Sequence, residues 1–299
     1  ILIQNGTVYT MTAEEPVRTD ILVEDGKIQR IESAITPQAD WQVIDAAGLR
    51  VYPGFIDAHC HLGMSEEAIG FEGNDVNEAT DPVTPQIRAI DGFNPTDREV
   101  AEACSAGVTC VATGPGSANV GGGQFDTIKT DGRREDKMIV KAPLAMKVAF
   151  GENPKRVYNK KQKMPSTRMG TAALLRQTLT EAINYMKKRE KDPDTQVDFK
   201  LEPLIPVLKR EIPLKAHAHR ADDIFTVIRI AREFHIRFTL DHCTEGHLIT
   251  DELAEENVQA IVGPSFGSRS KFELTNKTFD TPKALYEAGI PFAIMTIIL

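Results

Sequence analysis

The chain has 299 residues, of which 41% are hydrophobic and 26% are charged, a balance typical of a globular enzyme. A net charge of −8 argues against the clustered Lys and Arg of a nucleic-acid-binding surface, and no apolar run reaches the roughly 20 residues that cross a bilayer. The sparse cysteines do not form a disulfide framework and favour a cytoplasmic protein; they are Cys60, Cys104, Cys110 and Cys243.

Residues 1–52 are expected to form a small unit made only of β-strands. Strand-type residues surround two turn signals, Asn5-Gly6 and Asp25-Gly26, and no pattern with a helical period is present. We therefore predict two domains. The first is a β-sandwich segment over 1–52, and the second is a barrel over 53–299.

After Pro53, helical and strand patterns alternate. Apolar runs predict eight strands, at 51–59, 108–114, 123–130, 143–150, 212–218, 236–242, 258–264 and 290–296. Repeated αβ units with apolar strands indicate a parallel sheet covered by helices. The sequence thus predicts an α/β fold of the (β/α)₈ TIM type, although no clear helix separates the third strand from the fourth.

The histidines are distributed in a way that indicates metal chemistry. Six of the seven fall into three groups, which are His59 with His61, His217 with His219, and His242 with His247. The first member of each group ends a predicted strand, and residues i and i+2 of a strand point to the same side. Because strand ends converge on one face of a barrel, the imidazoles could meet around a divalent metal of the Zn type.

Several neighbouring residues have a simpler interpretation. His235 is alone at a helix end and is expected to be structural, and His247 is expected in a loop. Cys60 and Cys243 adjoin proposed ligands but should point the other way, into the barrel wall.

The segment "GFIDAHCHLG" after a β-type N-terminus resembles the first barrel strand of the amidohydrolase superfamily of metal-dependent hydrolases. The "HAH" of the fifth strand, the "DH" of the sixth and Lys147 near the end of the fourth fit the same resemblance. "LKAHAHRADDI" and "DHCTEGH" are similar to the imidazolonepropionase-related branch.

The resemblance implies a role for each site residue. His59 and His61 would bind the more buried metal, and His217 and His242 would bind a second one. Lys147 would be carbamylated by CO₂ and bridge the two metals, and the alternative is a barrel lysine paired with a carboxylate. His219 and His242 are the candidates for catalysis, since His219 shares a face with His217 and could contact the substrate.

The implied activity is hydrolysis of a C–N bond in an amide, a peptide-like or a cyclic amide small molecule, by a metal-activated hydroxide. The cofactor would be one or two divalent metals per chain, Zn foremost, with Mn, Fe or Ni as alternatives. A mononuclear enzyme of the imidazolonepropionase or deaminase type is the second version, in which His59, His61 and His217 bind the metal and His242 helps to activate water. A cytoplasmic homo-oligomer is expected.

One departure from the family pattern concerns the eighth strand. The family places an Asp at its end, but here "IPFAIMT" is followed by Ile297. We expect a native polypeptide longer than 299 residues, with an Asp soon after "IMT" and a break between Thr296 and Ile297. A catalytically silent scaffold on the same fold is the alternative.

Overall fold

A computed structural model of the chain describes residues 1–68 and 70–296. The chain divides into two compact units, Ile1–Phe55 and Ile56–Leu299, which are considered separately. The predicted break between Thr296 and Ile297 involves a residue outside the described part and stays a prediction.

The first unit is a five-stranded sheet, in the order β3-β2-β1-β4, with β5 also paired to β1. Its strands are β1 (Leu2–Val8), β2 (Val17–Glu24), β3 (Lys27–Glu32), β4 (Val43–Asp45) and β5 (Arg50–Val51). Asp25 and Gly26 both have positive φ, as a two-residue hairpin turn requires, and they join β2 to β3.

The other turn signal, at Asn5-Gly6, is a β-bulge within β1 and not a turn. The register with β2 shifts between Ile3 and Gly6, and Asn5 has a φ of 62°. A Cβ on Gly6 would lie 2.7 Å from Cγ2 of Val51 on β5. Glycine is therefore required here because a neighbouring strand passes close by, so the expectation of a turn was wrong.

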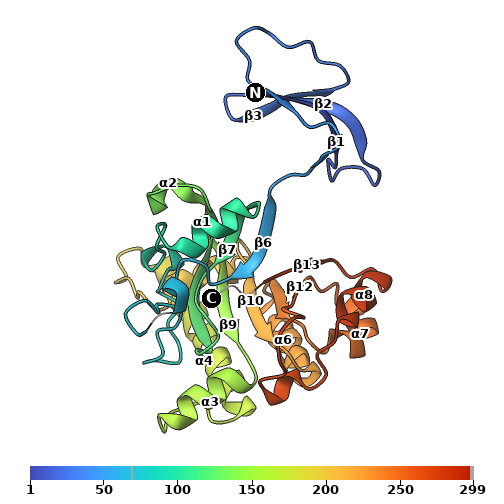
Figure 1. The fold of residues 1–299 in the computed structure, drawn as a ribbon. Helices are drawn as coiled ribbons and strands as arrows, with labels where there is room; N and C mark the ends of the chain where they lie inside the picture. The colour runs from blue at the N-terminus through green and yellow to red at the C-terminus, as the bar shows by residue number, and fades with distance from the viewer. Residues whose placement is uncertain (69, 297–299) are drawn as a thin grey trace. The chain divides into compact units, whose positions relative to one another are not determined.

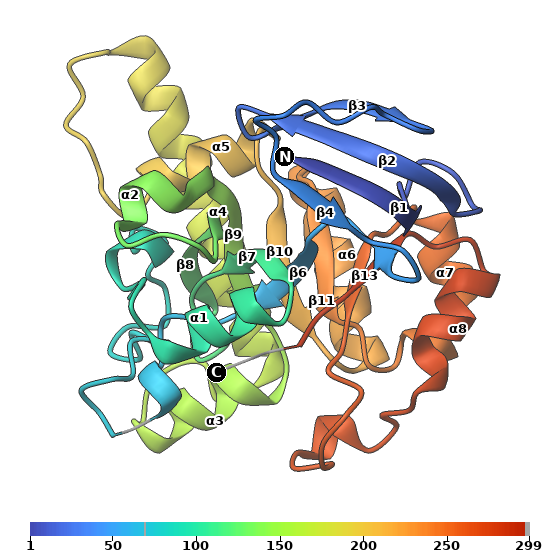
Figure 2. The same ribbon diagram turned by 45° about the horizontal axis from the view of Figure 1, so that its top comes forward.

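The second unit is built around one eight-stranded sheet, in the order β13-β12-β11-β10-β9-β8-β7-β6 (Figures 1 and 2). Its strands are β6 (Phe55–Cys60), β7 (Val108–Thr113), β8 (Gly121–Lys129), β9 (Ile139–Ala149), β10 (Leu214–Ala218), β11 (Phe238–His242), β12 (Ala260–Val262) and β13 (Phe292–Ile294). Thr296, just past β13, donates from its backbone N to Oδ2 of Asp57 on β6 (3.3 Å), which links the first and last strands. The eight predicted strands are present in this order, and the prediction of a TIM-type barrel is confirmed.

One strand runs against the predicted direction. β9, β10, β11, β12 and β13 pair in parallel, whereas β8 is antiparallel to both β7 and β9. A parallel crossover needs a dozen or more residues, and residues 114–120 between β7 and β8 are too few to form one. The chain therefore turns back as a hairpin, and the expectation that all eight strands are parallel was wrong.

Helices surround the strands of this unit (Figure 2). They are α1 (Arg98–Ser105), α2 (Glu135–Met138), α3 (Glu152–Lys160), α4 (Arg168–Lys191), α5 (Ile205–Leu208), α6 (Ala221–Phe234), α7 (Thr250–Glu255) and α8 (Asp280–Glu287). Leu179 of α4 and Ile224 of α6 are fully buried in one apolar cluster with Leu240 of β11. The cluster fixes the strand ends that carry the histidines.

Cys60 and Cys243 are fully buried in two apolar clusters, as expected from their positions beside the histidines. Burial raises the pKa of each thiol to about 12, so both stay protonated and act as packing groups. Within the described residues, none of the helices combines the length and the apolar character that a membrane span needs.

Candidate functional site

The register of the sheet arranges the polar side chains of the barrel in layers. Lys215 of β10 pairs directly with Lys147 of β9, and one layer further along His217 pairs with Asp241 of β11. Paired residues of parallel strands point to the same side. Two lysines and, above them, a histidine and an aspartate therefore converge inside the barrel.

His242 follows Asp241 directly, and in a regular strand their side chains would point to opposite faces. His242 has a φ of 74° and Cys243 a φ of 47°, so the strand ends in a left-handed turn. Non-glycine residues in this conformation cost about 1–3 kcal/mol and are concentrated at functional sites. The turn lets the His242 ring lie 4.3 Å from that of His217 and 5.6 Å from that of His59, between centroids.

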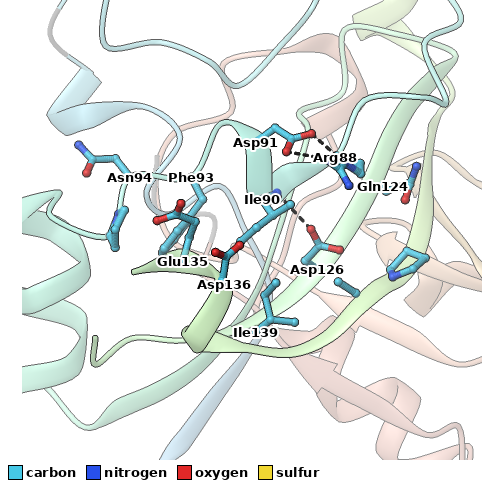
Figure 3. A pocket seen from close by; sticks show the side chains of 13 residues that line it. Arg88, Ile90, Asp91, Phe93, Asn94, Gln124, Asp126, Glu135, Asp136 and Ile139 are labelled. Carbon is cyan, nitrogen blue, oxygen red and sulfur yellow. Dashed lines mark hydrogen bonds and ion pairs between the residues drawn. The ribbon is translucent and has the colours of Figure 1, made fainter. Parts of the chain in front are cut away.

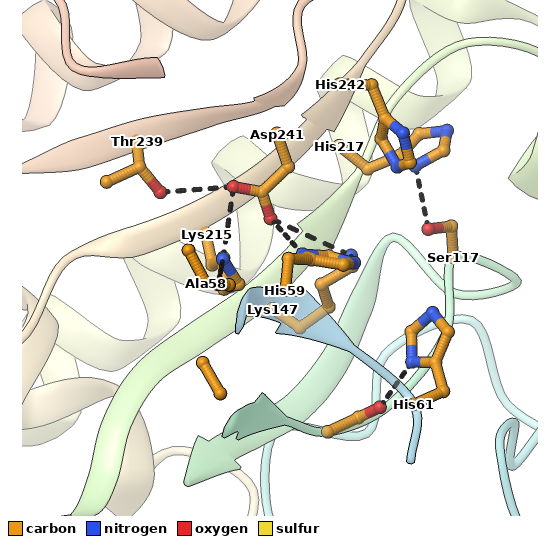
Figure 4. A network of polar contacts seen from close by, with 12 residues as sticks. Ala58, His59, His61, Ser117, Lys147, Lys215, His217, Thr239, Asp241 and His242 are labelled. Atoms are coloured by element: carbon orange, nitrogen blue, oxygen red, sulfur yellow. Dashed lines mark hydrogen bonds and ion pairs between the residues drawn. The ribbon is translucent and has the colours of Figure 1, made fainter. Parts of the chain in front are cut away.

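Asp241 is the centre of a buried polar network (Figure 4). Its Oδ2 accepts from Nδ1 of His59 at 2.8 Å, and its Oδ1 accepts from Nζ of Lys215 at 3.3 Å. Nζ of Lys147 lies 3.9 Å from Oδ2 and 3.2 Å from Nε2 of His59. One carboxylate thus faces two lysines and one histidine, all of them buried.

Phe125 of β8 forms the floor beneath this network. The ammonium nitrogens of Lys147 and Lys215 each lie 5.3 Å from its ring centroid, and the His59 ring lies 5.1 Å away. A Cβ on Gly114 would come within 2.3 Å of the Phe125 ring, so glycine is required where the β7–β8 loop begins. The ring thus packs against both lysines.

Three histidines gather at the mouth of the barrel. Atoms of His217, His219 and His242 that could bind a metal all lie within 4.8 Å of one another, and this is the one such group in the part of the chain that the structure describes. Nδ1 of His217 meets Oγ of Ser117 at 2.8 Å, and Nδ1 of His219 meets Oγ1 of Thr244 at 2.7 Å. The rings of His217 and His219 are therefore each oriented by a hydroxyl group at Nδ1, which leaves Nε2 available.

Hydrogen bonds to obligate acceptors fix the tautomer of three histidines. Nδ1 of His59 faces a carboxylate, while Nδ1 of His61 and of His242 face the backbone oxygens of Gly114 (2.7 Å) and Gly263 (2.9 Å). Carboxylate and carbonyl oxygens can only accept, so Nδ1 carries the proton. In the neutral ring Nε2 then presents a lone pair, as a metal ligand must.

Burial keeps these rings neutral. It lowers the pKa of His61, and likewise of His219, to about 4, and it moves the pKa of His59, His217 and His242 well below the usual range. Positively charged neighbours, Lys147 among them, add to the effect. At neutral pH the site offers uncharged imidazoles.

Lys147 has an unusual environment for a lysine. It is fully buried, and burial, reinforced by Lys215, lowers the pKa of its ammonium to about 7, although Asp241 opposes the shift. At neutral pH Lys147 is therefore an uncharged amine in a large fraction of the molecules, and this is the form that can react with CO₂.

The mouth opens into a cavity of about 320 Å³ that His61, His217 and His242 help to line. Its other polar lining residues are Asn77, Ser117, Asn153, Arg156 and Lys271. The cavity is large enough for a small molecule to reach the histidines.

A larger cavity, of about 720 Å³, shares no lining residue with this one (Figure 3). Asp126 is 1% exposed there and accepts from the backbone N of Ile90 (3.1 Å), and burial raises the pKa of its carboxyl to about 6. Arg88 is paired with Asp91 at 2.7 Å. No histidine is among its lining residues, so it lacks the chemistry of the first cavity.

The histidine group fits a divalent metal of the Zn type. Its members are buried and neutral, their possible ligand atoms lie within 4.8 Å of one another, and Zn²⁺ prefers imidazole nitrogen. Nε2 of His219 and Oε1 of Glu273 are buried without a hydrogen-bond partner among the described residues. A metal is one way in which such atoms are satisfied.

The predicted site residues occupy two adjoining places. His217, His219 and His242 form the group at the mouth, and His59 lies deeper, beside Lys147. The His61 ring lies 5.4 Å from that of His59. The roles assigned to these residues stay predictions. His247 lies in the short 3₁₀ turn Gly246–Leu248, with Nδ1 3.2 Å from the backbone oxygen of Thr244 and 3.0 Å from Oγ1 of Thr281 in α8.

Sequence reasoning missed Asp241, Lys215, Ser117 and Glu273. Lys215 lies two residues before His217, so the same i, i+2 rule could have found it. Ser117 and Glu273 come from loops, whose path the sequence pattern does not give.

Comparison with known proteins finds relatives that are named amidohydrolases, although no family model matches the chain. A crystal structure of an amidohydrolase from Thermotoga maritima MSB8 is 44% identical, with a TM-score of 0.95 over 98% of this chain and 78% of that one. Amidohydrolase tasK of Hapsidospora irregularis is 30% identical in an alignment of 297 positions that covers 84% of this chain.

The alignment spans only 30% of the length of amidohydrolase tasK. D-phenylhydantoinase of Escherichia coli (strain K12 / DH10B) is 38% identical over 64 residues, which make up 21% of this chain and 13% of that protein. None of these names specifies the imidazolonepropionase-related branch, so that assignment stays a prediction.

Proposed function

The chain belongs to the amidohydrolase superfamily, and from this premise we propose that it is a metal-dependent hydrolase that cleaves a C–N bond in an amide, peptide-like or cyclic amide substrate. The observation that carries the proposal is the buried group of His217, His219 and His242 beside a cavity of about 320 Å³. Neutral imidazoles that line a cavity suit a metal that acts on a small molecule.

Two sets of residues would hold the metal. His217 and His242, with His219 beside them, would hold one ion, Zn²⁺ foremost. His59, His61 and Lys147 would hold a second, with Lys147 as a carbamate formed when its amine gains CO₂ and loses a proton. When bound, a divalent metal lowers the pKa of a coordinated water toward neutrality and polarises a carbonyl group.

Other residues of the chain would support this chemistry by orienting the metal-binding histidines and the substrate. Asp241 holds the proton of His59 on Nδ1, and Ser117 holds the ring of His217. Arg156 and Lys271 line the cavity and would bring positive charge to a polar or anionic part of the substrate. His219 is the candidate for moving a proton between water and the leaving nitrogen, and His242 would take this role in the version in which it does not bind the metal.

A mononuclear enzyme of the imidazolonepropionase or deaminase type is the second candidate. Within the described residues, one group of three possible ligands lies within 4.8 Å, as a single metal would need, but it consists of His217, His219 and His242 and not of the predicted set of His59, His61 and His217. In this version a single metal would be bound and His242 would help to activate water.

Metal analysis and an activity screen test both candidates. The protein is loaded with Zn²⁺ or Mn²⁺, the metal is counted per chain, and hydrolysis of N-acyl amino acids, dipeptides and cyclic amides is measured, with His217→Ala as the control. Two metals per chain with C–N hydrolysis support the first version, and one metal supports the second. A protein that takes up no metal and cleaves none of these substrates would be a silent scaffold.

A further inference from the structure

Glu273 is a buried carboxylate for which the proposed function has no role. It lies in a short 3₁₀ turn, Phe272–Leu274, between β12 and α8, and is 1% exposed. Its Oε2 accepts a hydrogen bond from the backbone N of Glu152 at 2.8 Å. Its Oε1 has no hydrogen-bond partner among the described residues. A buried charged oxygen left in this way is costly unless a cation or donor completes it.

The backbone opposite is shaped to receive this carboxylate. Gly151 follows β9 with a φ of 79°, and a Cβ at this position would lie 2.6 Å from Oε2 of Glu273. Any other residue would push the carboxylate away. The glycine and the Glu152 N–H together hold one oxygen in place and leave the other directed elsewhere.

The second oxygen, Oε1, faces the histidine group. Oε1 lies 3.5 Å from Nε2 of His219 and 3.8 Å from Nε2 of His217. Nε2 of His219 is likewise buried without a partner in the described part of the chain. Two ligands of a tetrahedral ion with bonds of about 2.1 Å are separated by roughly 3.4 Å. The separations around Oε1 are thus close to those of atoms that share one metal ion.

We propose that Glu273 is an anionic ligand of the metal held by the group of His217, His219 and His242. The inference rests on the proposed function, because it requires that metal. A carboxylate beside neutral imidazoles supplies the negative charge that compensates a dication. Lys271, whose Nζ lies 3.6 Å from the same Oε1, offers the competing explanation of a plain ion pair.

Asp223 provides a matched control. Its Oδ2 also faces Gly151, 3.0 Å from the position of a Cβ, and it is 2% exposed. The Asp223 carboxylate is paired with Arg168, whose Nε lies 3.0 Å from Oδ1 of Asp223. Replacing either carboxylate by an amide therefore disturbs the same part of the barrel, but only Glu273 faces the histidines.

The test measures Zn²⁺ affinity by competition with a chromophoric chelator, and the visible spectrum of the Co²⁺-loaded protein. Glu273→Gln should weaken Zn²⁺ binding at least tenfold and change the Co²⁺ spectrum, whereas Asp223→Asn should stay within twofold of the unmodified protein. Lys271→Met removes the ion pair and should leave the Co²⁺ spectrum unchanged.

Wild-type affinity and spectrum in Glu273→Gln would overturn the ligand role and leave the proposed function intact. Absence of metal binding by the unmodified protein would overturn both. If Glu273→Gln does not fold, Glu273→Asp retains the charge but moves it away from the histidines, and it should weaken Zn²⁺ binding in a folded protein. Wild-type affinity in that variant would again contradict the ligand role.

Discussion

Replacing Asp241 by asparagine tests the network at the centre of the barrel. The carboxylate accepts from His59 Nδ1 (2.8 Å), from Lys215 Nζ (3.3 Å) and from Oγ1 of Thr239 (3.3 Å). An amide of the same shape has one accepting oxygen and one donating NH₂ group. It cannot accept from His59 and from Lys215 on opposite sides.

Both orientations of the new amide are unfavourable. With its oxygen toward Lys215, the NH₂ group faces Nδ1 of His59, which must then accept, and the ring proton moves to Nε2. His59 then has no lone pair on Nε2 for a metal. With its oxygen toward His59, the NH₂ group opposes the Lys215 ammonium, and two buried donors face each other.

The expected effect on metal binding of Asp241→Asn is a loss of about 10–100-fold in affinity, which corresponds to about 1.4–2.7 kcal/mol. The metal-free protein should also lose up to about 3–5 kcal/mol of unfolding free energy, because a buried ion pair is left with one partner. Release of the proton from Lys147 or Lys215 would reduce this loss, since the pKa of each is already lowered by burial.

Zn²⁺ competition titration and urea unfolding of the metal-free protein measure the two effects of Asp241→Asn. Thr239→Val is the control, because it removes one hydroxyl hydrogen bond to the carboxylate, worth about 1.5–3 kcal/mol, and keeps the carboxylate itself. If Asp241→Asn binds Zn²⁺ within twofold of the unmodified protein, the tautomer argument is refuted.

Three further predictions follow from the site and its support. If the protein binds two ions, Lys147→Ala should reduce the metal content to one and lower activity, and unchanged content with full activity would rule out the bridging role. The pKa of His61, and also that of His219, is lowered from 6.5 to about 4, so the unfolded chain binds more protons between these values. The metal-free protein should therefore lose roughly 3 kcal/mol per histidine as pH falls from 6.5 toward 4, and a urea midpoint that stays constant over this range would contradict the assignment. Leu179→Ala, at a fully buried position of α4, should cost about 2–5 kcal/mol of unfolding free energy while leaving Zn²⁺ affinity unchanged, and an equal loss from the half-buried Leu174→Ala would show that burial is not the cause.

The strands were predictable because each is a short apolar run between Gly, Pro or charged residues, and the histidines because they end such runs. The direction of β8 was not, since an apolar run reads the same in either direction along a sheet. The short loop of residues 114–120 was the available signal, because a parallel return needs a longer connection.

The rest of the site depends on tertiary structure. Asp241 and His242 both face the barrel interior only because His242 has a left-handed φ. No local sequence pattern predicts that conformation. Glu273 reaches the histidines from a loop between β12 and α8, and its place is set by Gly151 on another strand end. Such residues are recognised only after the chain is folded.

The reversed strand also has a consequence for how the barrel is assembled. β7, β8 and β9 form an antiparallel meander within Val108–Ala149, so their contacts are close in sequence. Parallel pairs such as β9 with β10 close much longer loops, which slows their formation. We therefore expect the meander to gain amide protection first in pulsed hydrogen exchange during refolding. The early meander would carry Lys147 and the Phe125 floor, and the strands that bear His217 and His242 would dock onto it afterwards.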